Sequence, residues 1–390
     1  MGNGFGVYFD PSKSTSGQRF FEALCRALAD QATPLNQLPA AILFNVSAPK
    51  KAILMAKLRR QKVALRIDGL YFDRLSPAFL ATFRWPLRHI FSLGLKYSWA
   101  HDFLAHLANL IACNYTAFAR MLLADWIIYQ SEFSQQLHLR FFPKKPHTII
   151  VNGSVYHPEE KSNSDAKVNG EIRLATIYDG WRAAKRIHEV IDFVRWAREE
   201  KNLPVHLTIL GYTGILPNCV PAAVKTLIET ASYIRTLPRF TSFTGEVRDV
   251  LLESDLYITF TYKDPCPNAV VEAMAHGLPV VGLGSGGVPD IVGDAGILLP
   301  VDDFADGFFS PYQYECDFRP VDYEQMLQAL LTVTSDPETF RARLRNRFAA
   351  DLDLQIVANR YASVMNQLAD QRDQSKSQAT SEVSTQGRTL

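Results

Sequence analysis

The sequence predicts an α/β protein of two domains, each built on a parallel sheet covered by helices. Three observations support this fold class. The chain has 390 residues, which is too long for one small core and fits two domains of roughly 150 to 200 residues. Hydrophobic residues make up 47% and charged residues 21% of the chain, which excludes collagenous and wholly disordered proteins. Apolar runs of strand length alternate with helical patterns in both halves, as in parallel sheets with helical crossovers.

The first half contains five expected strands and several helices. The strands are the apolar runs at 5–9, 41–46, 63–67, 127–129 and 148–151. After the first strand, Phe21, Leu24, Cys25 and Leu28 recur at helical spacing. Long helices are expected over 76–125. We therefore place an N-terminal domain at 1–157.

A polar segment then separates the halves, and the alternation begins again. The stretch 158–170 is rich in charge, Ser and Asn, which is typical of a linker. The second half has expected strands at 172–178, 205–210, 256–261, 280–283 and 296–299. These observations place a second doubly wound domain at 171–335. C-terminal helices at 336–370 are expected to cross back to the first domain, and the polar tail at 371–390 is expected to be disordered.

Charge and cysteine usage restrict partners and location. Residues 1–150 carry 18 Lys and Arg against 8 Asp and Glu, whereas residues 151–390 carry 23 against 32, so two different partners are expected. The five cysteines are odd in number and form no C-x-x-C pair, which argues against a disulfide framework and a zinc ribbon. With no export signal evident, we expect a cytoplasmic protein.

The most informative segment runs from Asp264 to Val292. Asp264 follows an expected strand, and Asn268 is expected to cap a helix that carries Glu272. A helix N-terminus attracts phosphate, and the glycine-rich loop 284–287 allows a second backbone to approach the same ligand. The two carboxylates, eight positions apart, can each hold a pair of vicinal hydroxyls. This combination predicts a site for a sugar nucleotide, although a plain strand-to-helix turn with two solvated acids is the simpler alternative.

This D-x7-E segment resembles the E-x7-E hallmark of retaining glycosyltransferases of family 4. The resemblance covers most of residues 5–369, is strongest over 240–300, and extends to RIDG (66–69), IIYQSEFS (127–134) and IIVNG (149–153). It implies the GT-B fold, in which two doubly wound Rossmann-like domains face each other across a crevice. The acceptor would bind to the domain at 1–157 and the nucleotide sugar to the domain at 171–335. It also implies that Asp264 binds the donor sugar and that Glu272 holds the ribose. Backbone N–H groups of the intervening loop would bind sugar and phosphate; the loop residues are Cys266, Pro267, Asn268 and Ala269.

The resemblance implies further roles for basic residues and for the N-terminal domain. Arg182 and Lys185 would neutralise the diphosphate leaving group, with Arg186 as a competitor for the second role and an ordinary charged helix start as the alternative. Gly17, within Ser16-Gly17-Gln18, would occupy the loop that approaches the donor phosphate. Asp68 stands where many relatives have a histidine, so it is the candidate for a polar contact near the reacting centre or, alternatively, a turn residue.

Taken together, the expected activity is transfer of a sugar from a nucleotide diphosphate sugar to an acceptor hydroxyl with retention of configuration. The resemblance implies a hexosyltransferase that needs no metal and no cofactor besides the donor, in polysaccharide or lipid-linked glycan synthesis. Two alternatives remain open: a nucleotide-sugar epimerase or hydrolase of the same fold, and a catalytically silent sugar-nucleotide binding protein. No nucleic-acid recognition motif is present, so a nucleic-acid partner is not expected.

One basic and aromatic segment raises a question about membranes. Residues 83–99 interleave Arg84, Arg88 and Lys96 with aromatic residues, as interfacial segments do. Peripheral contact with an anionic membrane, at its inner face, and ordinary solvated helices are both compatible with this pattern. The longest apolar region, 103–129, is interrupted by too many polar residues for a membrane-spanning helix.

Overall fold

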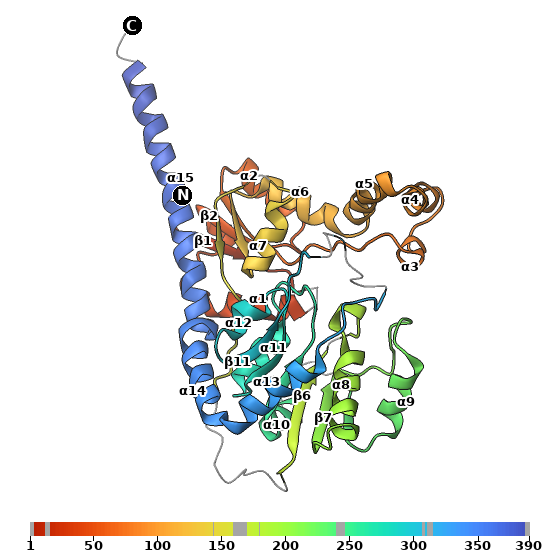
Figure 1. Cartoon of the computed structure of the whole chain (residues 1–390). Coiled ribbons are helices and arrows are strands. Elements are labelled where there is room, and N and C mark those ends of the chain that lie inside the picture. The colour runs from red at the N-terminus through yellow and green to blue at the C-terminus, as the bar shows by residue number, and fades with distance from the viewer. Residues whose placement is uncertain are drawn as a thin grey trace. The chain divides into compact units, whose positions relative to one another are not determined.

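The computed structural model describes most of the chain and divides it into two compact units (Figure 1). Its described residues are 4–11, 16–142, 144–158, 170–178, 180–238, 246–305, 309 and 315–386, with side chains except at 16–18, 246 and 373–386. The first unit comprises Met1–Leu70, Tyr115–Val155 and Asp353–Leu390, and the second comprises Tyr71–Asn114 and Tyr156–Leu352. Each unit contains one parallel sheet, so the predicted pair of α/β domains is confirmed.

The first unit is a five-stranded parallel sheet whose strands follow one another in chain order. They are β1 (Phe5–Tyr8), β2 (Ala41–Asn45), β3 (Lys62–Arg66), β4 (Trp126–Tyr129) and β5 (His147–Ile149). Alternate residues of each strand point to opposite faces. One face packs on α1 (Ser16–Ala27) and α15 (Leu354–Gln386), and the other on α2 (Lys50–Leu58) and α6 (Tyr115–Leu123). Helix α7 (Glu132–Leu139) begins where the Ser131 hydroxyl accepts a hydrogen bond from Ser134 N.

The second unit is a six-stranded parallel sheet with the order β11-β10-β9-β6-β7-β8. The strands are β6 (Ile172–Ile177), β7 (Val205–Leu210), β8 (Ile234–Leu237), β9 (Leu256–Thr259), β10 (Val280–Gly284) and β11 (Gly296–Pro300). The order reverses between β6 and β9, and such a reversal is where doubly wound sheets bind ligands, at the carboxyl ends of the strands. Strand β8 was not among the expected elements.

Helices complete the second unit around one apolar core. Helices α8 (Ile187–Glu199), α9 (Ala222–Thr230) and α13 (Tyr323–Ser335) contribute to the main core cluster with side chains from β6, β7, β9 and β10. Helices α10 (Glu246–Glu253), α11 (Asn268–Ala275) and α12 (Val288–Val292) also contact this sheet. Helix α14 (Pro337–Arg347) follows α13, and its first turn is capped by the Asp336 side chain.

Residues 71–114 group with the second unit, although their position in the sequence placed them in the expected N-terminal domain. They form α3 (Pro77–Leu80), α4 (Leu87–Lys96), α5 (Ser98–Asn109) and the π-helical turn Leu110–Asn114. Arg74 donates hydrogen bonds to Glu315 at 3.0 Å and to Asp317 at 2.6 Å. Phe309 packs edge-on against Phe72. These contacts join residues 71–114 to a segment of the second unit about 240 positions further along the chain.

Helix α15 groups with the first unit and is longer than expected. Its apolar residues, including Val357, Tyr361 and Met365, are fully buried against α1 and the sheet. The helix continues to Gln386, where the sequence predicts a disordered tail from residue 371. The added turns follow a helix already nucleated by packing and include several good helix formers, which favour its propagation. Residues 387–390 of the predicted tail lie outside the described residues.

One disulfide bond corrects the expectation from cysteine spacing. Cys219 and Cys316 are joined, with 5.5 Å between their Cα atoms, whereas Cys25, Cys113 and Cys266 are not disulfide-bonded. The expectation of no disulfide was wrong for this pair. The two cysteines are 97 positions apart, and only the folded second unit brings them together. Their pairing also removes the cysteine argument for a reducing compartment.

Candidate functional site

A lysine and an aspartate meet at the point where the strand order of the second sheet reverses. Lys185 ends the short 3-10 helix Ala183–Lys185 after β6, and Asp264 lies in the segment after β9. The Lys185 Nζ lies 2.6 Å from the Asp264 Oδ2, and both side chains are partly exposed. Because β6 and β9 are neighbours in the sheet, their carboxyl ends place this pair at the expected ligand position. The sequence had singled out both residues.

The segment after β9 is held by its own backbone and by the Lys185 loop. The Asp264 Oδ1 accepts a hydrogen bond from Cys266 N at 3.1 Å, and Tyr262 N donates to the Ala184 carbonyl at 2.8 Å. Helix α11 begins at Asn268, and the residue before its first turn is Pro267, which has an extended backbone. The expectation that Asn268 caps this helix was therefore wrong: Asn268 is the first helical residue, with Ala269 next to it.

The glycine-rich loop 284–287 lies directly against Asp264. Gly287 N donates to the Asp264 carbonyl at 2.8 Å. Gly286 has a φ of +62°, and a Cβ there would come within 2.2 Å of the same carbonyl oxygen. Only glycine fits this approach. The loop is thus part of the wall around Asp264.

A partly buried carboxylate, Asp303, also contacts this loop, and the sequence reasoning missed it. Asp303 accepts hydrogen bonds from the Ser285 hydroxyl and, at 2.7 Å, from Gly286 N. The Ser285 Oγ also accepts from Lys263 N at 2.9 Å, which links the loop to the segment after β9. Burial raises the pKa of Asp303, an effect that these hydrogen bonds oppose. No motif marks Asp303, although its position after β11 at the same sheet edge was a usable signal.

The other two basic candidates, Arg186 and Arg182, differ in burial and in their partners. Arg186 is buried, and its Nε and Nη2 donate to Glu189 at 2.7 and 2.6 Å, while Nη2 also donates to the Arg319 carbonyl. These hydrogen bonds hold the Arg186 guanidinium at the start of α8. Arg182 is exposed, and its charge opposes the burial that raises the pKa of Cys113 to about 11. Lys185 is therefore the candidate that is paired with Asp264.

Glu272 lies on α11, about one helical turn after its first residue, Asn268. Its side chain is half-buried, and its backbone carbonyl lies 2.7 Å from His276 Nδ1. Its charge adds to the burial that keeps the pKa of Tyr257 well above the usual tyrosine range. The hydrogen bond from Cys266 N to the Asp264 carboxylate connects Asp264 to the residues just before α11. Asp264 and the helix that carries Glu272 are therefore part of the same local structure.

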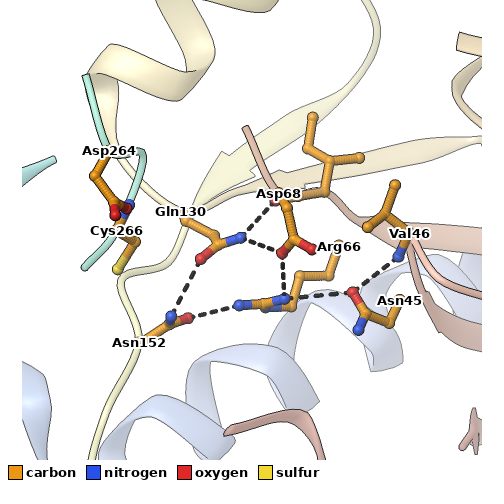
Figure 2. Close-up of polar contacts among 9 residues, drawn as sticks. Asn45, Val46, Arg66, Asp68, Gln130, Asn152, Asp264 and Cys266 are labelled. Carbon is orange, nitrogen blue, oxygen red and sulfur yellow. Dashed lines mark hydrogen bonds and ion pairs between the residues drawn. The ribbon is translucent and has the colours of Figure 1, made fainter. Parts of the chain in front are cut away.

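The first unit has its own polar cluster, shown in Figure 2, at the carboxyl ends of β2, β3 and β4. Its centre is Arg66, the last residue of β3, which is fully buried. Arg66 donates from Nη1 to Asn45 at 3.3 Å and to Asp68 at 3.0 Å, and from Nη2 to Asn152 at 2.9 Å. Its guanidinium also lies over the Phe20 ring. A buried charge is stable only with such partners.

Asp68 receives two of these bonds and is still accessible. Arg66 and Gln130 both donate to its Oδ1, the latter at 2.7 Å, and the carboxylate side chain is 40% exposed. Gln130 also donates to the Ile67 carbonyl and accepts from Asn152, which closes the ring of contacts seen in Figure 2. Asp68 is thus a positioned carboxylate. Gly17, the other candidate of this unit, lies in the first turn of α1 rather than in a loop.

The sequence singled out Asp68 but not its partners. Arg66, Gln130 and Asn152 each stand in one of the three segments that carried the family resemblance: RIDG, IIYQSEFS and IIVNG. One feature of the sequence could have identified all three: each is a polar residue at or just after the end of an apolar strand.

A separate cavity of about 710 Å³ lies elsewhere in the second unit. Its lining includes the basic residues Arg74, Arg186, Lys263 and Arg319 and the aromatic residues Tyr262 and Phe318. Lys185, Asp264 and Glu272 do not line it. The cavity is therefore distinct from the Lys185–Asp264 pair, although Lys263 joins the two regions by its backbone.

Comparison with known families gives one match within the second unit. Residues 176–312 match the family model described as "Glycosyl transferases group 1". The matched region contains Lys185, Asp264, Glu272 and the glycine-rich loop. No curated protein matches the sequence of this chain.

Comparison with solved structures establishes the fold. The chain is similar to Alr3699/HepE of Anabaena in complex with UDP-glucose, with a TM-score of 0.58 and 14% identity, over 93% of this chain and 99% of that one. It is similar to sucrose-phosphate synthase of Thermosynechococcus elongatus, with a TM-score of 0.55 and 13% identity, over 92% and 81%. It also resembles the pneumococcal O-GlcNAc transferase GtfA in complex with UDP and GlcNAc, with a TM-score of 0.52 and 13% identity. The match covers 84% of this chain and 56% of GtfA. The fold is GT-B.

Proposed function

We propose that this protein is a retaining glycosyltransferase that moves a sugar from a nucleotide diphosphate sugar to an acceptor hydroxyl. The observation that carries the proposal is the Lys185–Asp264 pair at the reversal point of the second sheet, within the region that matches a glycosyltransferase family. A fixed cation at this edge suits a diphosphate, and a carboxylate beside it suits sugar hydroxyls.

The candidate residues of the second unit have the following roles in this proposal. Lys185 and the exposed Arg182 bind the diphosphate and stabilise the charge that develops as it leaves. Asp264 orients the donor sugar, and Glu272 holds the ribose. Backbone N–H groups of Asn268 and Ala269 bind the sugar and phosphate oxygens, while Pro267 has no N–H and shapes the turn. The Cys266 N–H donates to the Asp264 Oδ1 and so holds this carboxylate in place.

The first unit binds the acceptor in the same proposal. Asp68 is held by Arg66 and Gln130 with its carboxylate partly exposed, so it can accept a hydrogen bond from a hydroxyl. Gly17, in the first turn of α1, stands where a helix N-terminus can approach phosphate. Retention follows the resembled family, in which the leaving phosphate takes the acceptor proton on the same face of the sugar.

The setting of the reaction is also proposed rather than observed. A metal-independent hexosyl transfer in polysaccharide or lipid-linked glycan synthesis, at the cytoplasmic face of a membrane, fits the resemblance and the fold. Among the structural neighbours, HepE is in complex with UDP-glucose and GtfA with UDP and GlcNAc, so UDP-hexoses are the first donors to test.

The test is a donor screen followed by nucleotide release. Thermal shifts with UDP-, GDP- and ADP-sugars identify the donor, and release of nucleotide is then measured with and without candidate acceptors, in EDTA. We expect Lys185→Ala and Asp264→Ala to reduce release at least about a hundredfold. The matched control is Lys201→Ala, which removes an exposed lysine paired with Glu324 and leaves the rate unchanged.

Three outcomes would count against the proposal. Unchanged release in both variants removes the assigned roles. Donor turnover that needs no acceptor indicates an epimerase or hydrolase of the same fold. Nucleotide binding without release from any donor indicates a silent binding protein.

A further inference from the structure

The helical hairpin of α4 and α5 exposes an unusual set of large apolar side chains. We call this set the hairpin face; its members are Trp85, Leu87, Ile90, Leu93, Leu95, Tyr97, Trp99 and Phe103. Eight of the twenty exposed large hydrophobic residues among the described side chains thus fall within nineteen positions. Single exposed apolar residues are normal, but so many exposed apolar side chains in one short hairpin favour an interaction surface.

The hairpin face is not the result of a poorly packed hairpin. Other side chains of α4 and α5 are buried, among them Phe91 and Leu104 in a cluster that also contains Phe79. Gly94 lies so close to Leu75 that a Cβ there would come within 2.4 Å of its side chain. The two helices therefore have a core of their own, and the exposed residues are the surplus of apolar side chains on the outside. Trp85 and Trp99 are 82% and 84% exposed.

The charges around the hairpin face indicate its partner. Arg84, Arg88 and Lys96 are exposed on the same hairpin, and Asp102 is the single acidic residue within 84–103. Tryptophan and tyrosine beside lysine and arginine are the composition that favours the headgroup region of a bilayer. Two copies of this face would bring like charges together, which disfavours a self-associated dimer.

We propose that the hairpin face inserts into the interface of an anionic lipid bilayer. The aromatic and aliphatic side chains enter the headgroup boundary, while the three cations bind anionic lipid headgroups. Within the described residues, no helix has the length and apolarity to span a bilayer, so the contact is peripheral. This inference does not depend on the proposed enzymatic activity, because the hairpin contains none of the residues assigned to donor or acceptor.

Two intrinsic tryptophans make the proposal directly measurable with the full-length protein. Vesicles of phosphatidylcholine with phosphatidylglycerol, and others of phosphatidylcholine alone, are titrated into the protein at low and at physiological salt. We expect a blue shift of tryptophan emission and co-sedimentation with the anionic vesicles, and quenching by lipids brominated near the headgroup. The W85S/W99S variant loses this quenching, although the other three tryptophans remain.

Matched variants separate the contribution of the cations from that of the tryptophans. R84Q/R88Q weakens partitioning into anionic vesicles by about tenfold or more, whereas K225Q/R235Q, which removes two exposed charges elsewhere in the second unit, does not. Ile215→Ser, at a residue 74% exposed, is the control for the tryptophan variant. Absence of sedimentation and of quenching with anionic vesicles at low salt overturns the proposal. So does a stable dimer in light scattering whose formation needs Trp85 and Trp99, because a second copy then covers the face.

Discussion

The backbone of Gly286 lies against the backbone of Asp264 so closely that a Cβ at position 286 would come within 2.2 Å of the Asp264 carbonyl oxygen and 2.7 Å of its nitrogen. Backbone atoms cannot move aside as the end of a flexible side chain can. The two loops at the carboxyl ends of β9 and β10 are therefore mutually positioned, and the place of the Asp264 carboxylate depends on a residue with no side chain.

Replacement of Gly286 by alanine should damage both stability and the site. The φ of +62° alone costs an alanine roughly 1 to 2 kcal/mol, and the clash adds to it by displacing the Asp264 loop. We therefore expect the free energy of unfolding to fall by more than this backbone cost, as measured by urea denaturation. Binding of nucleotide sugar, measured by calorimetry, should also be weaker.

Gly214→Ala is the control for this prediction. Gly214 has a similar φ of +76°, but a Cβ there would meet nothing within 4 Å. Gly214→Ala therefore has the unfavourable backbone conformation without the clash. If both variants lose the same free energy of unfolding, the close approach of Gly286 to Asp264 does not contribute to stability.

Much of the fold could be predicted because strands of parallel sheets are short apolar runs. Strands β7 and β10 begin at the expected residues, Val205 and Val280. Strand β8 was missed because only Ile234 of its four residues is buried, so its sequence shows no apolar run. Edge strands of this kind are set by pairing with a neighbour, here β7, and not by their own composition.

The site could be predicted only where its residues lie in a local pattern. Asp264 and Glu272 are eight positions apart, and Lys185 follows an apolar strand. The partners of Asp68 could not be predicted, since Arg66 and Asn152 are 86 positions apart and meet through the register of β3, β4 and β5. The same limit applies to residues 71–114, which group with the second unit and contact it through distant pairs such as Arg74 and Glu315.

The Arg66 cluster should be a strong contributor to the stability of the first unit. Arg66→Met removes a buried guanidinium and leaves Asn45, Asn152 and Asp68 without their shared donor. We expect a loss of about 2 to 4 kcal/mol in the free energy of unfolding. Arg66→Lys should recover little of it, since one ammonium cannot reproduce the planar fork.

An exposed ion pair provides the comparison for Arg66. Glu324→Gln breaks the contact with Lys201 in the second unit and should cost less than about 1 kcal/mol, because solvent screens both charges. Denaturation curves of the three variants, measured in one buffer, check both expectations. A loss below 1 kcal/mol for Arg66→Met would mean that water replaces the lost bonds at this place.

The disulfide predicts a specific count of thiols. Protein purified without reductant and denatured should react with a thiol reagent at three cysteines, Cys25, Cys113 and Cys266, and at five after reduction. Cys219→Ser should raise the unreduced count to four by freeing Cys316. An unreduced count of five in the natural protein would show that the two cysteines are close but not bonded.

Buried His138 should make the first unit sensitive to mild acid. Its Nδ1 lies 2.6 Å from the Ser134 carbonyl, while its Nε2 has no hydrogen-bond partner among the described residues. A proton on Nε2 would therefore be buried without an acceptor, and burial lowers the pKa of His138 from 6.5 to about 4.

Between these two pKa values the unfolded chain binds a proton at His138 that the folded chain does not. The free energy of unfolding therefore falls as the pH decreases from 6.5 towards 4, by about 3 kcal/mol in all from this one group. His138→Asn keeps an amide donor at the position of Nδ1 for the Ser134 carbonyl but cannot titrate, so urea denaturation at pH 7, 5.5 and 4.5 should show a smaller pH dependence in that variant. His89→Gln, at an exposed histidine, should retain the natural slope, and identical slopes in all three proteins would contradict the assignment to His138.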